Sequence, residues 1–207
     1  MSSDRSYHSS LREEQALQTR LRIRRAAREL FATQGFTNTT INQIAEAAGV
    51  SPATVYAVYE SKAGIVVAML EDLEESVGLG SYIQQMLAEE NPRTQLRLFI
   101  RSHCLLFTEG ADILRAAMRA IEDPHVAELA ETGDQHRRKG IETLVGIWQK
   151  KGALRKGLSR RQAVERLWLL TTVESFLTAI DRLGWKPKTY ERWLADLTER
   201  EMFGEEG

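Results

Sequence analysis

Helix-breaking residues are sparse in this chain of 207 residues, and most of them stand at the edges of segments. The sequence contains 4 prolines and 14 glycines, which leaves long stretches whose apolar residues recur with helical spacing. No segment alternates between apolar and polar residues for long enough to indicate a strand. We therefore expect an all-α protein of about nine helices.

Composition and a few local features restrict where such a chain can act. Hydrophobic residues make up 43% of the sequence and charged residues 28%, which fits one or two folded domains. The single cysteine, Cys104, cannot form an internal disulfide and suits a reducing compartment. The N-terminus is polar, unlike a signal peptide, and the longest apolar stretch, residues 167–180, is interrupted by polar side chains. These features predict a cytoplasmic protein without a membrane partner.

Capping residues and apolar periodicity place the expected helices. Thr40 and Gln43 form a capping box, and Ser51 before Pro52 is a typical N-cap. Residues 1–16 show no apolar periodicity and are expected to form a flexible N-terminal arm. The expected helices span residues 17–35, 41–48, 52–59, 62–76, 92–109, 111–121, 124–151, 159–183 and 189–203.

Two short helices within residues 40–59 are joined by four residues that include Gly49, which is the spacing of a helix-turn-helix. Upstream, five arginines lie between residues 20 and 28, although the whole chain carries a net charge of only −1. Such a basic segment attracts a phosphate backbone, but it is equally typical of a solvated helix face. Spacing and charge together make double-stranded DNA a candidate partner.

The residues in and around this motif carry a resemblance to a known family. They are Thr39-Thr40-Ile41, Ile44-Ala45, Ala48-Gly49-Val50-Ser51, Thr54-Val55-Tyr56, Tyr59 and Ser61-Lys62, with Ala27, Leu30-Phe31 and Gly35-Phe36 upstream. This pattern resembles the N-terminal domain of the TetR family of bacterial transcriptional regulators. A weaker similarity to the same family covers Gly184-Trp185 and residues 190–195.

The resemblance implies both an architecture and a function. Residues 17–77 would form a three-helix DNA-binding domain, and residues 78–207 a helical bundle for dimerisation and ligand binding. The chain would be a ligand-responsive repressor that binds a palindromic operator as a homodimer through the recognition helix of residues 51–59. A small-molecule effector of unknown identity would release it from the operator.

The recognition helix divides into two faces at 100° per residue. Val55, Val58 and Tyr59 are expected to pack inward, whereas Ala53, Tyr56 and Ala57 would face the major groove, with Thr54 at the border. The outward face lacks the Arg, Lys, Asn and Gln side chains that make bidentate base contacts. Sequence specificity would then depend on Thr54, on Asn42 or Gln43, on Arg5 and Arg12 of the arm, or on DNA shape.

Hydroxyls and one cation are the expected phosphate contacts. Lys62 lies in the first turn of a helix, where the macrodipole disfavours a positive charge, and an arriving phosphate would explain it. A solvated lysine and a plain surface Tyr56 are the alternatives. Val58 stands where the family usually has a polar or aromatic residue, so we expect no backbone contact from it. The predicted DNA-binding residues are Thr39, Thr40, Gln43, Ser51, Ala53, Thr54, Tyr56, Ala57, Tyr59 and Lys62.

The expected helix of residues 159–183 is apolar on two faces, so two neighbours must cover it. Its own bundle would cover one face and a partner chain the other, unless it is the buried central helix of a monomer. The predicted dimer-interface residues are Leu169, Val173, Phe176, Ile180 and Leu183, with Trp193 and Leu197 from the last helix.

The resemblance also implies a small-molecule pocket among residues 92–183. Residues that interrupt apolar faces there are the candidates for its lining: Phe99, His103, Phe107, Trp148, Trp168, Thr171 and Glu174. For the aromatic residues and His103, an ordinary core position is the alternative. Glu174 stands where the pattern calls for an apolar residue. We expect it to be buried, so it must pair with a partner such as His103 or an arginine, be neutralised, or face the pocket and select a ligand with a cation or a hydrogen-bond donor.

Two other classes of protein fit less well. For an enzyme, Gly78-Leu79-Gly80 does not continue as a dinucleotide loop, because Ile83 takes the place of the third glycine. The four histidines give no pair at metal-ligand spacing, and one cysteine cannot build a thiolate zinc site. We therefore expect no catalytic residue, cofactor or metal. A purely structural helical dimer would leave the pattern from Thr40 to Lys62 unexplained.

Overall fold

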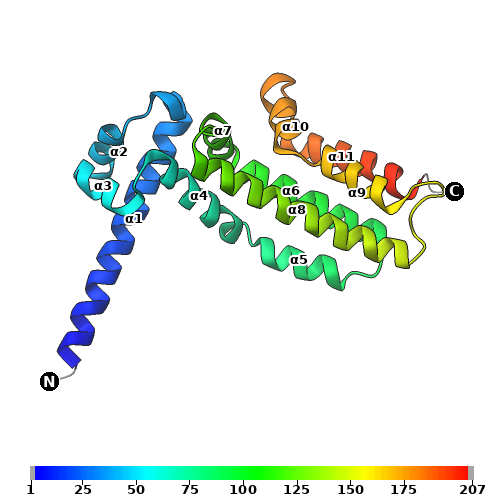
Figure 1. Ribbon diagram of the computed structural model, residues 1–207, viewed down its shortest axis with the longest axis horizontal. Coiled ribbons are helices and arrows are strands. Elements are labelled where there is room, and N and C mark those ends of the chain that lie inside the picture. Colours follow the sequence, from blue (N-terminus) through cyan, green and yellow to red (C-terminus); the bar gives the residue numbers. More distant parts are fainter. Residues whose placement is uncertain (1–2, 205–207) are drawn as a thin grey trace. The chain divides into compact units, whose positions relative to one another are not determined.

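The computed structural model describes the backbone of residues 3–204 and the side chains of residues 13–73 and 75–204. Over this backbone the chain is all-α, as predicted, with eleven α-helices and one π-helical segment (Figure 1). The elements are α1 (Ser3–Asn38), α2 (Ile41–Ala48), α3 (Pro52–Tyr59), α4 (Lys62–Ser76), α5 (Leu79–Ala88), α6 (Pro92–Glu109), α7 (Ala111–Arg119), α8 (Pro124–Lys150), α9 (Arg160–Leu170), α10 (Val173–Leu177), η1 (Thr178–Arg182) and α11 (Pro187–Phe203). No single described helix is long and apolar enough to span a membrane. Among the described residues, α3 and part of α4 reach that length and apolar character only when taken together, and they are bent by 56° relative to each other.

The first helix begins earlier than the periodicity predicts. α1 starts at Ser3, whereas the apolar spacing starts at Leu17. The side chains of Arg5 and Arg12 lie outside the described part of the chain, so their contact with DNA stays a prediction. Gly35 interrupts α1 with a φ of 81°, which is the glycine stop expected there.

The helix count exceeds nine for two reasons. α5 is a separate helix that the sequence does not indicate, because Gly78 and Gly80 interrupt the segment. It begins directly after Gly78, whose backbone has the left-handed conformation. The helix expected over residues 159–183 is broken at Thr171 and Thr172 into α9, α10 and η1. Thr172 is extended, with a ψ of 153°, and its hydroxyl caps α10 by accepting a hydrogen bond from the Ser175 amide.

A half-buried arginine from another helix stabilises this break. Arg137 of α8 donates from Nη1 to the Trp168 carbonyl (2.7 Å), the Thr171 carbonyl (3.1 Å) and the Thr171 hydroxyl (2.8 Å). Its Nη2 pairs with the Asp134 carboxylate, which also accepts a hydrogen bond from the Trp168 indole. The guanidinium thus satisfies carbonyls that the end of α9 leaves without a helical partner.

The helices divide into two compact units. Unit 1 contains residues up to Glu71 together with Asp112–Leu129, and unit 2 contains Asp72–Ala111 and the residues from Ala130 onward. Ile113, Ala116 and Val126 belong to the same apolar core as the residues of α1 to α4. Residues 112–129 therefore pack with the predicted DNA-binding segment, while the functional division into 17–77 and 78–207 stays a prediction.

Unit 1 is further tied together by an ion pair. Arg28 of α1 meets Asp112 of α7 with two parallel hydrogen bonds, from Nε to Oδ2 at 2.6 Å and from Nη2 to Oδ1 at 2.9 Å. This bidentate geometry is the strongest arrangement of a guanidinium and a carboxylate. It fixes the start of α7 on α1 beside the apolar core.

A series of aromatic rings runs through the core of unit 2. The rings of Phe99, His103 and Phe107 on α6 lead to Phe176 of α10 and on to Tyr190 of α11, with neighbouring centroids 4.2 to 6.1 Å apart. His103 Nδ1 lies 2.9 Å from the Phe99 carbonyl oxygen. Burial lowers the pKa of His103 to about 4, and the positive charge of Arg137 acts in the same direction. His103 is therefore a neutral member of the ring series.

We expect His103 to make stability sensitive to acid. Its pKa is about 4 in the folded chain against an ordinary 6.5, so the unfolded chain takes up a proton first as the pH falls. The stability is complete above 6.5 and decreases by up to about 3 kcal/mol as the pH falls towards 4. Urea unfolding at a series of pH values should show this decrease in the wild type and a smaller one in His103→Gln. Parallel pH profiles would contradict the neutral state of His103 in the folded chain.

Two glycine substitutions should act in opposite directions. A Cβ on Gly64 would lie 2.1 Å from the Tyr59 carbonyl oxygen, so Gly64→Ala must push α4 away from α3. Gly140, inside α8, has open space where a Cβ would be. We expect Gly64→Ala to lower the free energy of unfolding by about 1–3 kcal/mol and Gly140→Ala to raise it by about 0.5–1 kcal/mol. Thermal unfolding followed by circular dichroism measures both, and an unchanged melting temperature for Gly64→Ala would show that the close approach is absent.

Candidate nucleic-acid interface

The helix-turn-helix is built by the caps that the sequence predicts. The Thr40 hydroxyl accepts a hydrogen bond from the backbone N–H of Gln43 at 3.2 Å. In return, the side-chain oxygen of Gln43, Oε1, accepts one from the backbone N–H of Thr40 at 2.8 Å. Gly49 ends α2 in the left-handed conformation, with φ 66° and ψ 40°. Ser51 then caps α3 by accepting a hydrogen bond from the Thr54 amide at 3.1 Å. The turn between the two helices is therefore fixed by local interactions.

The two faces of α3 differ in exposure as predicted, because one packs inward and the other faces solvent. Val55 is fully buried, and Val58 and Tyr59 pack half-buried against the core of unit 1. On the other face Ala53 and Ala57 are exposed, and Tyr56 has 53% of its surface accessible. A large aromatic side chain that projects so far from a small helix is available to a partner.

Two of the predicted DNA-binding residues use their hydroxyl groups for hydrogen bonds within the protein. Thr39 is only 1% exposed, and its hydroxyl donates to the Gly35 carbonyl at 2.8 Å. The Tyr59 hydroxyl donates to the Arg20 carbonyl at 3.1 Å and accepts a hydrogen bond from Arg24. The Tyr59 hydroxyl joins α3 to α1 and the Thr39 hydroxyl bonds to the end of α1, so neither supports the prediction of a side-chain contact with DNA.

Lys62 has a structural partner that the sequence does not reveal. Its Nζ donates to the Phe36 carbonyl at 2.6 Å and to the Thr39 carbonyl at 2.8 Å, and it lies 4.2 Å from the centroid of the Phe36 ring. Partial burial lowers the pKa of this amine. The carbonyls at the end of α1 therefore explain the cation at the start of α4 without a phosphate. The predicted phosphate contact of Lys62 stays untested.

The exposed polar groups of the motif lie on α2 and α3. Thr40, Gln43 and Ser51 are exposed, although their oxygens already take part in the caps. Thr54 is half-buried, and its hydroxyl lies 2.9 Å from that of Ser51. These groups form one outward surface together with Tyr56, Ala53 and Ala57.

Arg22 is a candidate DNA-binding residue that the sequence analysis does not single out. In the sequence it is one of the five arginines of the basic segment, but in the structure its Nη1 lies 3.8 Å from the position that a Cβ on Gly49 would take, at the turn between α2 and α3. Two neighbours in the segment are neutralised, since Arg25 pairs with Glu29 and Arg28 with Asp112. Position at the turn, rather than charge alone, distinguishes Arg22.

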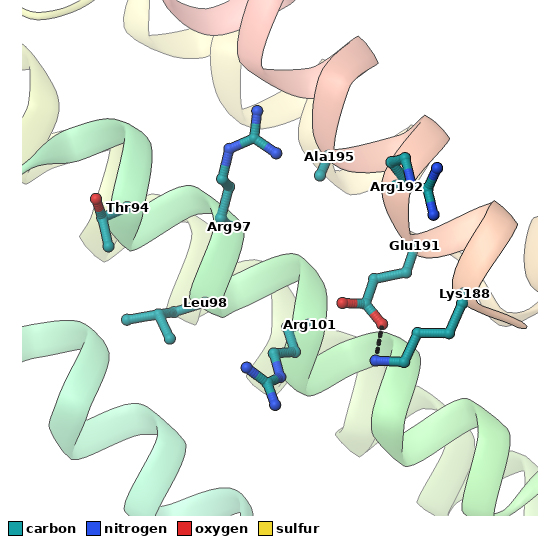
Figure 2. A pocket seen from close by; sticks show the side chains of 8 residues that line it. All are labelled: Thr94, Arg97, Leu98, Arg101, Lys188, Glu191, Arg192 and Ala195. Atoms are coloured by element: carbon teal, nitrogen blue, oxygen red, sulfur yellow. Dashed lines mark hydrogen bonds and ion pairs between the residues drawn. The ribbon is translucent and has the colours of Figure 1, made fainter.

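The predicted pocket residues take part in several separate contacts of unit 2, and their role in lining a pocket stays a prediction. Trp148 is fully buried and donates its indole hydrogen to Gln95 Oε1 at 2.9 Å, while Trp168 and Thr171 belong to the Arg137 cluster. Phe99, His103 and Phe107 belong to the ring series of α6. A groove of about 330 Å³ between α6 and α11 is lined by none of the seven (Figure 2).

The expectation that Glu174 is buried is wrong. The break at Thr171 and Thr172 changes the helical register, and Glu174 is exposed in the first turn of α10. A carboxylate at that place is favoured by the helix macrodipole, so it needs neither His103 nor an arginine as partner.

The predicted dimer residues divide by exposure. Leu169, Leu183 and Trp193 are 66%, 62% and 41% exposed, so solvent meets large parts of these apolar side chains in the single chain. Val173, Ile180 and Leu197 are half-buried. Phe176 is only 1% exposed, because it packs between Phe107 and Tyr190 with ring centroids 5.6 and 5.4 Å away. It belongs to the core of its own chain and cannot be an interface residue here.

Known proteins match both the motif and the fold. Residues 23–69 match the family model of the bacterial regulatory proteins of the tetR family. Of the solved structures, NalD of Pseudomonas aeruginosa, the secondary repressor of the MexAB-OprM multidrug efflux pump, is 25% identical, with a TM-score of 0.73 over 92% of this chain and 98% of NalD. No curated protein matches the chain.

Two further solved structures share the fold at lower identity. A transcriptional regulator of Saccharomonospora viridis in complex with choline is 22% identical, with a TM-score of 0.69 over 88% of this chain and 96% of its own. FadR of Bacillus subtilis in complex with stearoyl-CoA is 15% identical, with a TM-score of 0.69 over 88% of this chain and 98% of its own. The predicted resemblance to the TetR family is confirmed, and the chain is a DNA-binding transcriptional regulator with a TetR-type helix-turn-helix.

Proposed function

We propose that this regulator is a repressor that binds a palindromic operator as a homodimer and is released by a small molecule. The observation that carries the proposal is the outward face of α3, where Tyr56 projects between two exposed alanines on a helix fixed at both ends. It acts by binding rather than by catalysis, in the bacterial cytoplasm where the chromosome lies. One helix-turn-helix reads few base pairs, so two copies one DNA turn apart are needed.

The surface of α2 and α3 suits close approach to the major groove. Ala53 and Ala57 leave room for the backbone of α3 to approach the base edges and can contact thymine methyl groups. Gln43 keeps its amide hydrogens free, because only its oxygen takes part in the capping box. Tyr56 and Arg22 would contact phosphates on either side of this surface. The exposed hydroxyls of Thr40 and Ser51 would add neutral contacts.

The dimer would form through exposed apolar residues on α9, directly after η1 and on α11. Leu169, Leu183 and Trp193 keep large parts of their surface accessible in the single chain, and water is a poor neighbour for them. A second copy would cover them symmetrically. The release step is supported by the fold shared with regulators solved with choline and with stearoyl-CoA.

Selection from random-sequence DNA tests the operator and its contacts. We expect the protein to enrich a palindrome, and Tyr56→Ala and Arg22→Ala to weaken binding about equally for all sequences. Arg22→Ala should also reduce the slope of log K against log salt by about 0.9, one phosphate contact. Failure to enrich any sequence would overturn the proposal.

Lys62→Ala separates the two roles of Lys62 in the same assay. If its amine serves the carbonyls of Phe36 and Thr39, the variant should lose about 1–3 kcal/mol of stability and keep the wild-type salt slope. A slope reduced as in Arg22→Ala would instead establish the predicted phosphate contact.

Leu169→Glu should separate dimerisation from folding. Because Leu169 is 66% exposed, the variant should keep the helical content and melting behaviour of its protomer but sediment as a monomer with weakened operator binding. Leu87→Glu, at a similarly exposed leucine on α5, is the matched control and should remain dimeric. An intact dimer in Leu169→Glu would place the interface elsewhere.

A further inference from the structure

The connection between α8 and α9 is the most basic stretch of unit 2. Six of the 28 basic residues of the chain lie within residues 150–161, and no acidic residue lies between Glu142 and Glu165. The chain as a whole carries a net charge of −1, so this stretch differs from a more acidic remainder. We call residues 150–161 the basic turn, which joins the end of α8 to the start of α9 (yellow in Figure 1).

Backbone hydrogen bonds give the basic turn a fixed shape. The Ala153 amide donates to the Trp148 carbonyl at 2.9 Å, which closes the end of α8. The Arg155 amide donates to the Met202 carbonyl at 2.9 Å and so attaches the turn to α11. The Leu158 amide donates to the Arg155 carbonyl at 3.2 Å. The basic side chains therefore extend from an ordered backbone.

Much of the positive charge of the basic turn has no carboxylate beside it. Lys150, Lys156 and Arg160 are exposed, and none of them forms an ion pair within the described residues. Arg160 donates to a backbone carbonyl of α8 at 3.4 Å, and Lys151 donates to a backbone carbonyl after α5. A carbonyl satisfies a hydrogen bond but leaves the positive charge in place.

The two carboxylates that pair with the basic turn compensate it poorly. Glu201 Oε2 lies 3.6 Å from Arg155 Nη2 and also binds Arg166 of α9, so two arginines share one negative charge. The pair of Arg161 with Glu165, at 3.1 Å, is largely exposed and contributes little. Arg161 also lies in the first turn of α9, where the macrodipole disfavours a cation. The basic turn therefore attracts negative charge from outside the chain.

The side chains of the basic turn restrict the kind of anion that fits. None of the large apolar side chains that are exposed in the described part of the chain lies within residues 150–161. Insertion into a lipid surface and the core of a protein interface need such side chains, and stacking of single-stranded bases needs aromatic ones. A DNA duplex needs neither, because its phosphates bind cations by charge and release counterions. Since phosphates repeat along both strands, cations that diverge from one another can each meet one.

We propose that the basic turn is a second DNA-binding surface, which contacts the phosphate backbone of a duplex without reading its sequence. Lys150, Lys156 and Arg160 make the phosphate contacts. Unit 2 thereby has an affinity for DNA that does not involve α3. The proposal does not depend on the operator, the dimer or the effector, and it requires only that a DNA-binding regulator works among duplex DNA.

Fluorescence anisotropy with a short DNA duplex of random sequence tests the proposal on the full chain. The starting protein carries Arg22→Ala and Tyr56→Ala, which remove the proposed phosphate contacts of unit 1, and we expect it to retain salt-dependent binding. Adding Lys150→Gln and Lys156→Gln should reduce the slope of log K against log salt by about 1.8, two phosphate contacts. Both lysines are exposed, so the circular dichroism spectrum should not change.

Lys139→Gln together with Lys186→Gln is the matched control, because both are exposed lysines of unit 2 outside the basic turn. This pair removes the same charge and should leave the salt slope unchanged. An equal reduction by the control pair would attribute the effect to net charge and overturn the proposal. A slope that neither pair changes would overturn it as well.

Two further measurements separate duplex DNA from other anions. Polyglutamate at equal charge should displace the duplex less well than unlabelled duplex does, because its charges lie further apart along the chain. Equal displacement would assign the basic turn to an acidic protein and overturn the proposal. Duplex binding that begins only after removal of Glu205 and Glu206 would assign it to the chain's own C-terminus, with the same consequence.

Discussion

Backbone carbonyls at the end of α1 and in the turn after it accept hydrogen bonds from a side chain of another helix. Lys62 supplies the donor, since its amine reaches the carbonyls of Phe36 and Thr39 from the start of α4. On the far side of the motif, the Tyr59 hydroxyl reaches the Arg20 carbonyl, and Gly64 lets α4 touch the backbone of Tyr59. The helix-turn-helix is thereby held by contacts with the backbone of α1 and by the close approach of α4. The direction of α3 depends on these contacts.

Local physical chemistry explains what could be predicted. A capping box, a glycine stop and a proline after a serine act within a few residues, so the bounds of α2 and α3 follow from the sequence. The division of α3 into a buried and an exposed face also follows, because one core covers it from one side. The resemblance of the motif to a known family rests on the same local signals.

Contacts between distant residues explain what could not be predicted. The break between α9 and α10 depends on Arg137, some thirty residues upstream, and it moves Glu174 to the surface. Phe176 fits an interface stripe only in an unbroken helix, and in the broken one it packs against Phe107 and Tyr190. Thr39 and Lys62 carry polar groups suited to phosphate, but in the folded chain these groups donate hydrogen bonds to backbone carbonyls of α1 and the turn after it.

The placement of residues 112–129 in unit 1 has a consequence for recombination between regulators of this fold. The polypeptide crosses between the units near residues 71, 111 and 129, so a single crossover cannot exchange one unit cleanly for that of a homologue. A chimaera joined after residue 77 would pair α1 to α4 with a foreign α7, and the apolar side chains around Ile113 would meet surfaces that did not evolve with them. Viable hybrids need a second splice that carries residues 112–129 along with the DNA-binding half.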